Sequence, residues 1–191
     1  YTTLFRSVDG TTETELQQTL RSYNQLPNDV FLHGRLLSQR QIINGKTTRT
    51  DYQYSQPDNT LAGGAVLQID ELLTGFDHKD GTYHAQISLK QVYSLITGQL
   101  VLKEDLTNVP MLLRYDALGR VTSETASPGD PQAQATRTYE YTLTSSDGQQ
   151  SSMVVTDVKN AKTITHFDGL NRAVYQGRIE PDADSRAEPR Q

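Results

Sequence analysis

The central stretch of the chain reads Tyr115-Asp-Ala-Leu-Gly-Arg-Val-Thr-Ser-Glu124. An aspartate can close a tight turn by accepting hydrogen bonds from backbone N–H groups two residues further on, and a glycine gives backbone freedom that a β-carbon hinders. The tyrosine should end one strand and supply buried area, and Leu118 should fold back over it. Arg120 should begin the return strand with a stem that covers apolar surface. The stretch therefore predicts the turn of an antiparallel hairpin.

The same pattern returns later in the chain. Residues 104–120 align without gaps on residues 156–172, at an offset of 168 − 116 = 52. The second copy has Phe167 in place of tyrosine and Asn171 in place of glycine; asparagine is the next-best residue for left-handed backbone geometry. The residues that we expect to form the two turns are Tyr115, Asp116, Leu118, Gly119 and Arg120, and then Phe167, Asp168, Gly169, Leu170 and Arg172.

A looser copy begins at Ser22-Tyr-Asn24 and resumes, after an insertion, at Gly34-Arg-Leu-Leu-Ser38. Thr97-Gly98-Gln99 adds a further turn of related composition. The clearest copies thus occupy residues 94–124 and 152–180, and the loose copy occupies residues 22–54. No linker separates them, so residues 1–191 are interpreted as a single β-rich segment of repeats.

The composition favours strands. Of the 191 residues 35% are hydrophobic, and ten Tyr stand beside four Phe and no Trp, a set that suits half-buried pleated surfaces. Asn44-Gly45 and Asp147-Gly148 predict two-residue hairpin turns, the second joining residues 137–144 to residues 152–157 as an antiparallel pair. Residues 12–23 have a spacing that fits a helix or a strand equally. The fold class expected is all-β, with antiparallel β-hairpin repeats that form a curved strip.

Several functions find little support. The formal charge is −5 with dispersed Lys and Arg, so no nucleic-acid footprint is visible. There is no Cys, no common catalytic motif, and no apolar run of the about 18 residues that cross a bilayer. A metal could be sought at residues 77–81 with His84, or calcium at Asp182-Ala-Asp184, but these read as turns and a solvated tail. Asp116 and Asp168 each belong to a separate turn, so we expect no catalytic residue, no metal and no cofactor.

Tyr115–Glu124 resembles the defining unit of tyrosine/aspartate (YD, Rhs) repeats. With residues 94–100, 137–141 and 167–172, it is similar to the repeat region of the B component of bacterial Tc insecticidal toxins, over about residues 20–180. The resemblance implies a curved, spiral β-strip within a larger hollow shell. That shell would enclose a cytotoxic region of a companion C component, and a pore-forming A component would deliver it. The self-cleaving motif of the family is not found, so autoproteolysis is not carried over.

Two functions are therefore expected from the sequence. The first is a non-catalytic structural segment of a secreted, toxin-enclosing shell, contacting other segments of the same chain and inserting into no membrane. The alternative is a cell-surface adhesin or glycan-binding β-module, because tyrosine rings can stack on sugars. The absence of an initiator Met and the polar sequence of residues 181–191 favour a fragment of a longer protein.

Overall fold

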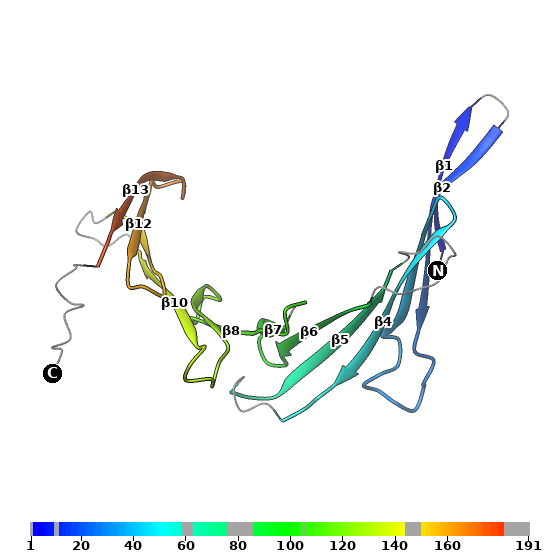
Figure 1. Cartoon of the computed structure of the whole chain (residues 1–191), viewed down its shortest axis with the longest axis horizontal. Helices are drawn as coiled ribbons and strands as arrows, with labels where there is room; N and C mark the ends of the chain where they lie inside the picture. The colour runs from blue at the N-terminus through cyan, green and yellow to red at the C-terminus, as the bar shows by residue number, and fades with distance from the viewer. Residues whose placement is uncertain are drawn as a thin grey trace. The chain divides into compact units, whose positions relative to one another are not determined.

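The computed structural model describes residues 2–9, 12–58, 63–75, 86–104, 106–143 and 150–181. These residues form strands, turns and loops without a helix (Figure 1), which confirms the all-β prediction. The strands are β1 (Thr2–Asp9), β2 (Thr12–Tyr23), β3 (Leu36–Ile43), β4 (Lys46–Ser55), β5 (Val66–Thr74), β6 (Gln86–Ser94), β7 (Leu100–Glu104), β8 (Pro110–Tyr115), β9 (Val121–Ala126), β10 (Ala135–Thr142), β11 (Ser152–Thr156), β12 (Lys162–Phe167) and β13 (Ala173–Ile179).

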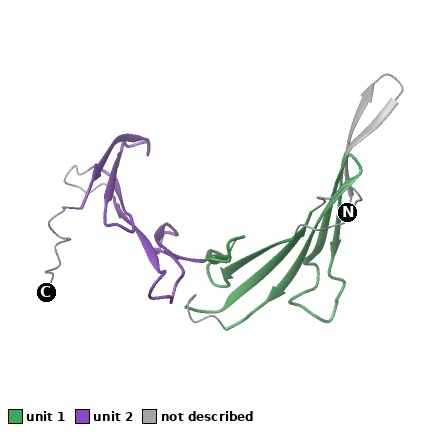
Figure 2. Ribbon diagram, viewed as in Figure 1, with its two compact units in different colours: residues 1–109 green, residues 110–191 purple. Residues whose placement is uncertain are grey.

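The chain divides into two compact units, residues 1–109 and residues 110–191 (Figure 2). The first contains β1 to β7 and the second β8 to β13. Inside each unit every strand pairs with the next one along the chain, always antiparallel. Each unit is therefore a β-meander, the arrangement that successive hairpins produce.

Two of the sequence-based pairings are present as expected. Asn44 and Gly45 have φ angles of 51° and 74°, and they join Ile43 to its partner Lys46 in a two-residue hairpin. β10 pairs with β11 from Thr138↔Thr156 to Thr142↔Ser152. The Asp-Gly turn proposed between β10 and β11 lies outside the described residues.

Residues 12–23 form a strand, so the helical alternative is wrong. β2 lies between β1 and β3 and pairs with both over most of its length. Leu16 and Leu20 stand four residues apart. Because four is an even number, this spacing fits the two-residue period of a strand as well as a helical turn. Two flanking strands satisfy the backbone hydrogen-bonding groups on both sides of β2, which a solitary helix would have to satisfy internally.

The apolar core is thin. Among the described residues, the buried apolar side chains are Val66, Val92, Val101, Leu102, Leu112 and Ala161. The first four form one cluster in the first unit, where Val92 of β6 stands directly opposite Leu102 of β7. Most other strand residues are half-buried on either face. Ladder hydrogen bonds and cross-strand side-chain pairs therefore carry much of the stability.

Val92 is the test of this small cluster because its side chain is fully buried, with 0% exposure. We expect Val92→Ala to lower the free energy of unfolding by about 2 kcal/mol, since it leaves a cavity that the sheet cannot fill. Val30, at 95% exposure, is the matched control, and Val30→Ala should leave stability unchanged. Urea denaturation of both variants measures the difference, and equal midpoints would refute the assignment of the core.

Candidate functional site

The two predicted aspartate turns have the same hydrogen-bond geometry. The Asp116 Oδ1 atom accepts hydrogen bonds from the backbone N–H groups of Leu118 and Arg120, both at 2.9 Å. The Asp116 Oδ2 atom accepts from Arg120 Nε at 2.7 Å and lies 2.7 Å from Nη2. The bond to the residue two positions on is the one that the sequence predicted, whereas the return of the Arg120 guanidinium to the same carboxylate was not anticipated.

The second copy repeats this arrangement. Asp168 Oδ1 accepts from the N–H groups of Leu170 and Arg172 at 2.9 Å each. Asp168 Oδ2 accepts from Arg172 Nε at 2.8 Å, and Nη2 lies 2.7 Å away. Both carboxylates therefore use their oxygens to close their own turns.

A left-handed residue completes each turn. Gly119 has a φ of 79° and Asn171 a φ of 60°, which is the geometry that the sequence required of these positions. Gly169 lies at the position of Ala117 and has no positive φ, so a glycine is not needed there. Turn formation thus depends on the fourth residue of the turn rather than the second.

The leucines of the turns do not behave as expected. Leu118 and Leu170 are 69% and 75% exposed, so the prediction that they fold over the preceding aromatic residue is wrong. They occupy the tips of the hairpins, where the carboxylate draws their backbone N–H groups inward and leaves the side chains in solvent.

The turns hold their carboxylates in the ionised form. The pKa of Asp116 is lowered, first by the Arg120 N–H and then by the Arg120 side chain and the Leu118 N–H. The pKa of Asp168 is lowered first by the Arg172 side chain and then by backbone N–H groups. A carboxylate bound in this way is a poor general acid, because hydrogen bonding to the charged form opposes protonation. The arrangement builds turns rather than presenting an acid–base pair.

Sequence reasoning missed a third turn of the same kind. Asp157 Oδ1 accepts from the N–H groups of Lys159 at 2.8 Å and Ala161 at 2.9 Å, and Asn160 has a φ of 64°. Backbone bonds lower the pKa of Asp157 as well, the one from Lys159 most. The available signal was an aspartate followed three residues later by asparagine. It was overlooked because Thr156, not an aromatic residue, precedes it.

Four hairpins share one plan of backbone pairing. They start from the aromatic residues Tyr23, Tyr93, Tyr115 and Phe167, each of which is the last or the last but one residue of an even-numbered strand. Each aromatic residue pairs across a register shift, with Leu36, Leu100, Val121 and Ala173 respectively. A register shift in an antiparallel pair is a β-bulge, which increases the local twist.

In these four hairpins the residue after the aromatic closes the loop. This closing residue is Asn24, Ser94, Asp116 or Asp168, and its N–H donates to the carbonyl of Arg35, Gln99, Arg120 or Arg172 at 2.9 Å. Its own carbonyl accepts from Gly34, Gly98, Gly119 or Asn171 at 2.8–3.0 Å. The four residues that donate to this carbonyl all have a positive φ, between 60° and 79°. The loose copy at residues 22–54 and the Thr-Gly turn at residue 98 therefore follow the geometry of the two clear turns.

In two of these hairpins an arginine of the turn contacts a tyrosine on the strand that follows the hairpin. The Arg120 guanidinium carbon lies 4.4 Å from the centre of the Tyr141 ring, and the Tyr141 hydroxyl donates to the Val121 carbonyl at 2.9 Å. In the first unit, Arg35 lies 5.2 Å from the Tyr54 ring centre, and the Tyr54 hydroxyl donates to the Leu36 carbonyl at 2.9 Å. We call each such arrangement an arginine–tyrosine clasp. It explains how the arginine covers apolar surface.

The remaining candidates give no site within the described chain. Residues 77–81 with His84, and the Asp182-Ala-Asp184 segment, lie outside the described residues. Within the described ranges, no group of three or more His, Asp or Glu side chains could hold a metal ion. In the same ranges, no helix is long and apolar enough to span a membrane.

No protein-family model matches this chain, and no curated protein matches it either.

The left-handed requirement at Gly119 is directly testable. We expect Gly119→Val to destabilise the protein by about 2 kcal/mol, because a β-branched residue is strained at positive φ. Gly119→Asn should be close to wild type, since Asn171 adopts this geometry in the equivalent turn. Thermal melts monitored by circular dichroism compare the variants. If valine were tolerated as well as asparagine, the turn assignment would fail.

The depressed pKa values predict a loss of stability in acid. A group with a folded pKa below its unfolded value, about 3.9 for Asp, stabilises the fold above that value and stops doing so as pH falls through the folded pKa. The triple variant Asp116→Asn/Asp157→Asn/Asp168→Asn should thus be less stable than wild type at pH 7, and it should lose less stability than wild type as the pH falls below 4. Denaturant midpoints across the acid range measure this. Glu140→Gln on β10 removes an exposed carboxylate and should keep the steep acid slope of the wild type.

Proposed function

We propose that this chain is a non-catalytic structural segment of a secreted, toxin-enclosing shell built from YD/Rhs repeats, of the kind formed by the B component of Tc insecticidal toxins. The observation that carries the proposal is the recurrence of one hairpin plan at Tyr23, Tyr93, Tyr115 and Phe167, each with a bulge, a closing residue and a left-handed residue. A chain that repeats one hairpin extends a sheet strand by strand, and such a sheet can form the wall of a shell.

The thin core supports a wall rather than a self-sufficient domain. Isolated domains usually bury one face of a sheet against a second layer of structure. In each unit the described strands form a single layer, and few of their apolar side chains are buried. Exposed apolar residues of the hairpin tips, such as Ile96 at 85%, are consistent with a chain that has further protein around it.

The chemistry of the turns supports a structural role as well. The carboxylates of Asp116, Asp157 and Asp168 all accept hydrogen bonds from backbone N–H groups, and each also forms an ion pair with an arginine. In the proposed shell, the partners of this segment are further repeats of the same chain, a companion C-type component whose toxic region is enclosed, and an A-type component that forms the pore.

The alternative, a glycan-binding or adhesive module, has less support from the tyrosines. Tyr54 and Tyr141 each have a ring face covered by arginine and a hydroxyl bonded to the backbone. Tyr139 donates to Glu124 at 3.0 Å. A sugar-stacking surface needs free ring faces, and these rings serve the fold instead.

The decisive experiment is to sequence the gene on both sides of this segment and to image its full product by electron microscopy. We expect many more aromatic-Asp-x-x-Gly-Arg units in the flanks, a companion gene, and a closed hollow particle. A reading frame without further repeats, or a product that is small and solid, would overturn the proposal. Tyrosine-dependent hits on a glycan array would then favour the adhesive module.

A further inference from the structure

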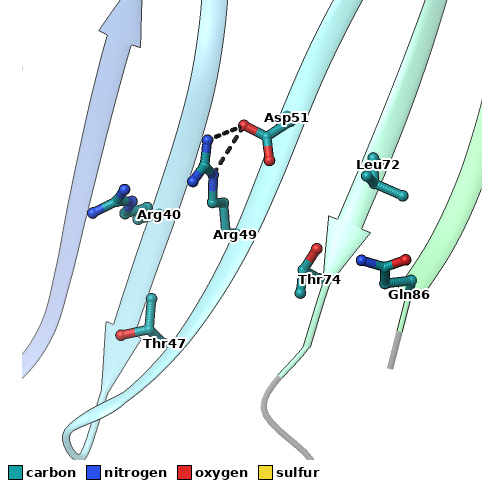
Figure 3. A pocket seen from close by; sticks show the side chains of 7 residues that line it. All are labelled: Arg40, Thr47, Arg49, Asp51, Leu72, Thr74 and Gln86. Carbon is teal, nitrogen blue, oxygen red and sulfur yellow. Dashed lines mark hydrogen bonds and ion pairs between the residues drawn. The ribbon is translucent and has the colours of Figure 1, made fainter. Parts of the chain in front are cut away.

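One face of the first unit carries a groove of about 340 Å³. Its lining comes from four neighbouring strands (Figure 3): Arg40 of β3, Thr47, Arg49 and Asp51 of β4, Leu72 and Thr74 of β5, and Gln86 of β6. The groove contains no aromatic ring and none of the aspartate-turn residues. It is therefore separate from the hairpin plan described above.

Strand register places two arginines side by side at the centre of this groove. Arg40 is the direct cross-strand partner of Arg49, Arg49 is the partner of Thr74, and Thr74 is the partner of Gln86. Directly opposite residues of an antiparallel pair point to the same face, with β-carbons about 5 Å apart. Like charges on directly opposite residues destabilise an antiparallel pair, so an anion bound beside this row would offset the repulsion.

In the described lining of the groove, the one carboxylate pairs with only one of the two arginines. Asp51 Oδ1 accepts hydrogen bonds from Arg49 Nε at 2.9 Å and Nη2 at 2.6 Å. Among the described residues, none forms a hydrogen bond or ion pair with Arg40, and Figure 3 shows its guanidinium apart from the Arg49–Asp51 pair. Asp70, the next carboxylate on this face, lies one cross-strand row beyond Leu72 and binds the Gln68 amide at 2.7 and 3.0 Å.

The described lining of the groove therefore has one arginine without a carboxylate partner and a surplus of donors. No residue in the described lining takes the five N–H donors of Arg40; the Thr47 hydroxyl lies on the neighbouring strand, and the Thr74 hydroxyl and the Gln86 amide continue the row beyond Arg49. A guanidinium group matches the two oxygens of a carboxylate in a planar, bidentate contact. Of the charged residues in the described lining, two are arginines and one is an aspartate, so one negative charge balances them, whereas a doubly charged phosphate or sulfate would exceed it.

From this geometry we propose that the groove binds a carboxylate group between Arg40 and Arg49. The carboxylate comes from an acidic sugar or from an acidic side chain of a polypeptide, and both sources present the same two oxygens. The proposal does not depend on the shell function, because it rests on the arginine row alone. It would stand if the shell were disproved, and it could fail with the shell intact.

The test is a nuclear magnetic resonance titration of the full chain labelled with ¹⁵N in the arginine Nε positions. The probes are glucuronate and N-acetylglutamate amide, and their neutral partners are glucose and N-acetylglutamine amide, at constant ionic strength. We expect saturable shifts at Arg40 and Arg49 with a Kd of about 1 mM. Arg114, exposed on β8 of the other unit, is the internal control. The acid that binds more tightly identifies whether the carboxylate comes from an acidic sugar or from an acidic side chain.

Variants test whether Arg40 and Arg49 are the residues that bind the carboxylate. Arg40→Gln should weaken binding by about tenfold, and Arg40→Lys by less, because a lysine keeps the charge but loses the planar fork. Asp51→Asn should strengthen binding several-fold by freeing Arg49, while Arg114→Gln should change nothing. Melting curves verify that each variant is folded, and Arg40→Gln should be at least as stable as wild type at low salt. Linear shifts equal to those of Arg114, or unchanged affinity in Arg40→Gln, would overturn the proposal.

Discussion

The structure depends on the closure of a short turn by one carboxylate and one left-handed residue. In the turn from Asp116 to Arg120, two backbone N–H groups bind a single carboxylate oxygen, and Gly119 adopts a φ of 79°. This geometry determines which residue of β8 faces which residue of β9. Because side chains alternate between faces, a slip of one residue would exchange the two faces of the whole hairpin. Turn closure therefore determines the register on which every cross-strand contact depends.

The arginine of the turn extends this control to a third strand. Arg120 binds Asp116 through its guanidinium and also covers the ring of Tyr141, which belongs to β10 rather than to the hairpin itself. Its side chain is 32% exposed, whereas that of Arg172 is 72% exposed, and within the described residues no aromatic ring lies under Arg172. Exposed ion pairs contribute little. The two aspartate turns thus share their closure but differ in how firmly they bind the neighbouring strand.

Much of this arrangement was predictable from the sequence, and the remainder has physical reasons. Asp116 and Gly119 were recognisable because a turn residue acts within four positions of the chain. The burial of Leu118 was mispredicted because exposure depends on neighbouring strands, which local spacing does not specify. Ser94 was missed as a closing residue, although its Oγ accepts from the N–H groups of Ile96 and Thr97 at 3.3 Å. A hydroxyl replaces the carboxylate there, so the pattern of residue types changes while the backbone plan persists.

The same local closure explains how a sheet with so little core can be specified. Cooperative domains usually obtain their register from a buried face, where a slip would expose apolar side chains. In the described strands that penalty is small, since most side chains on either face are half-buried. Turn chemistry must then supply the specificity that packing does not. Asn24, Ser94, Asp116 and Asp168 repeat that chemistry at the ends of four even-numbered strands. Each hairpin thereby determines its own register, so the sheet can be lengthened by further hairpins without a larger core.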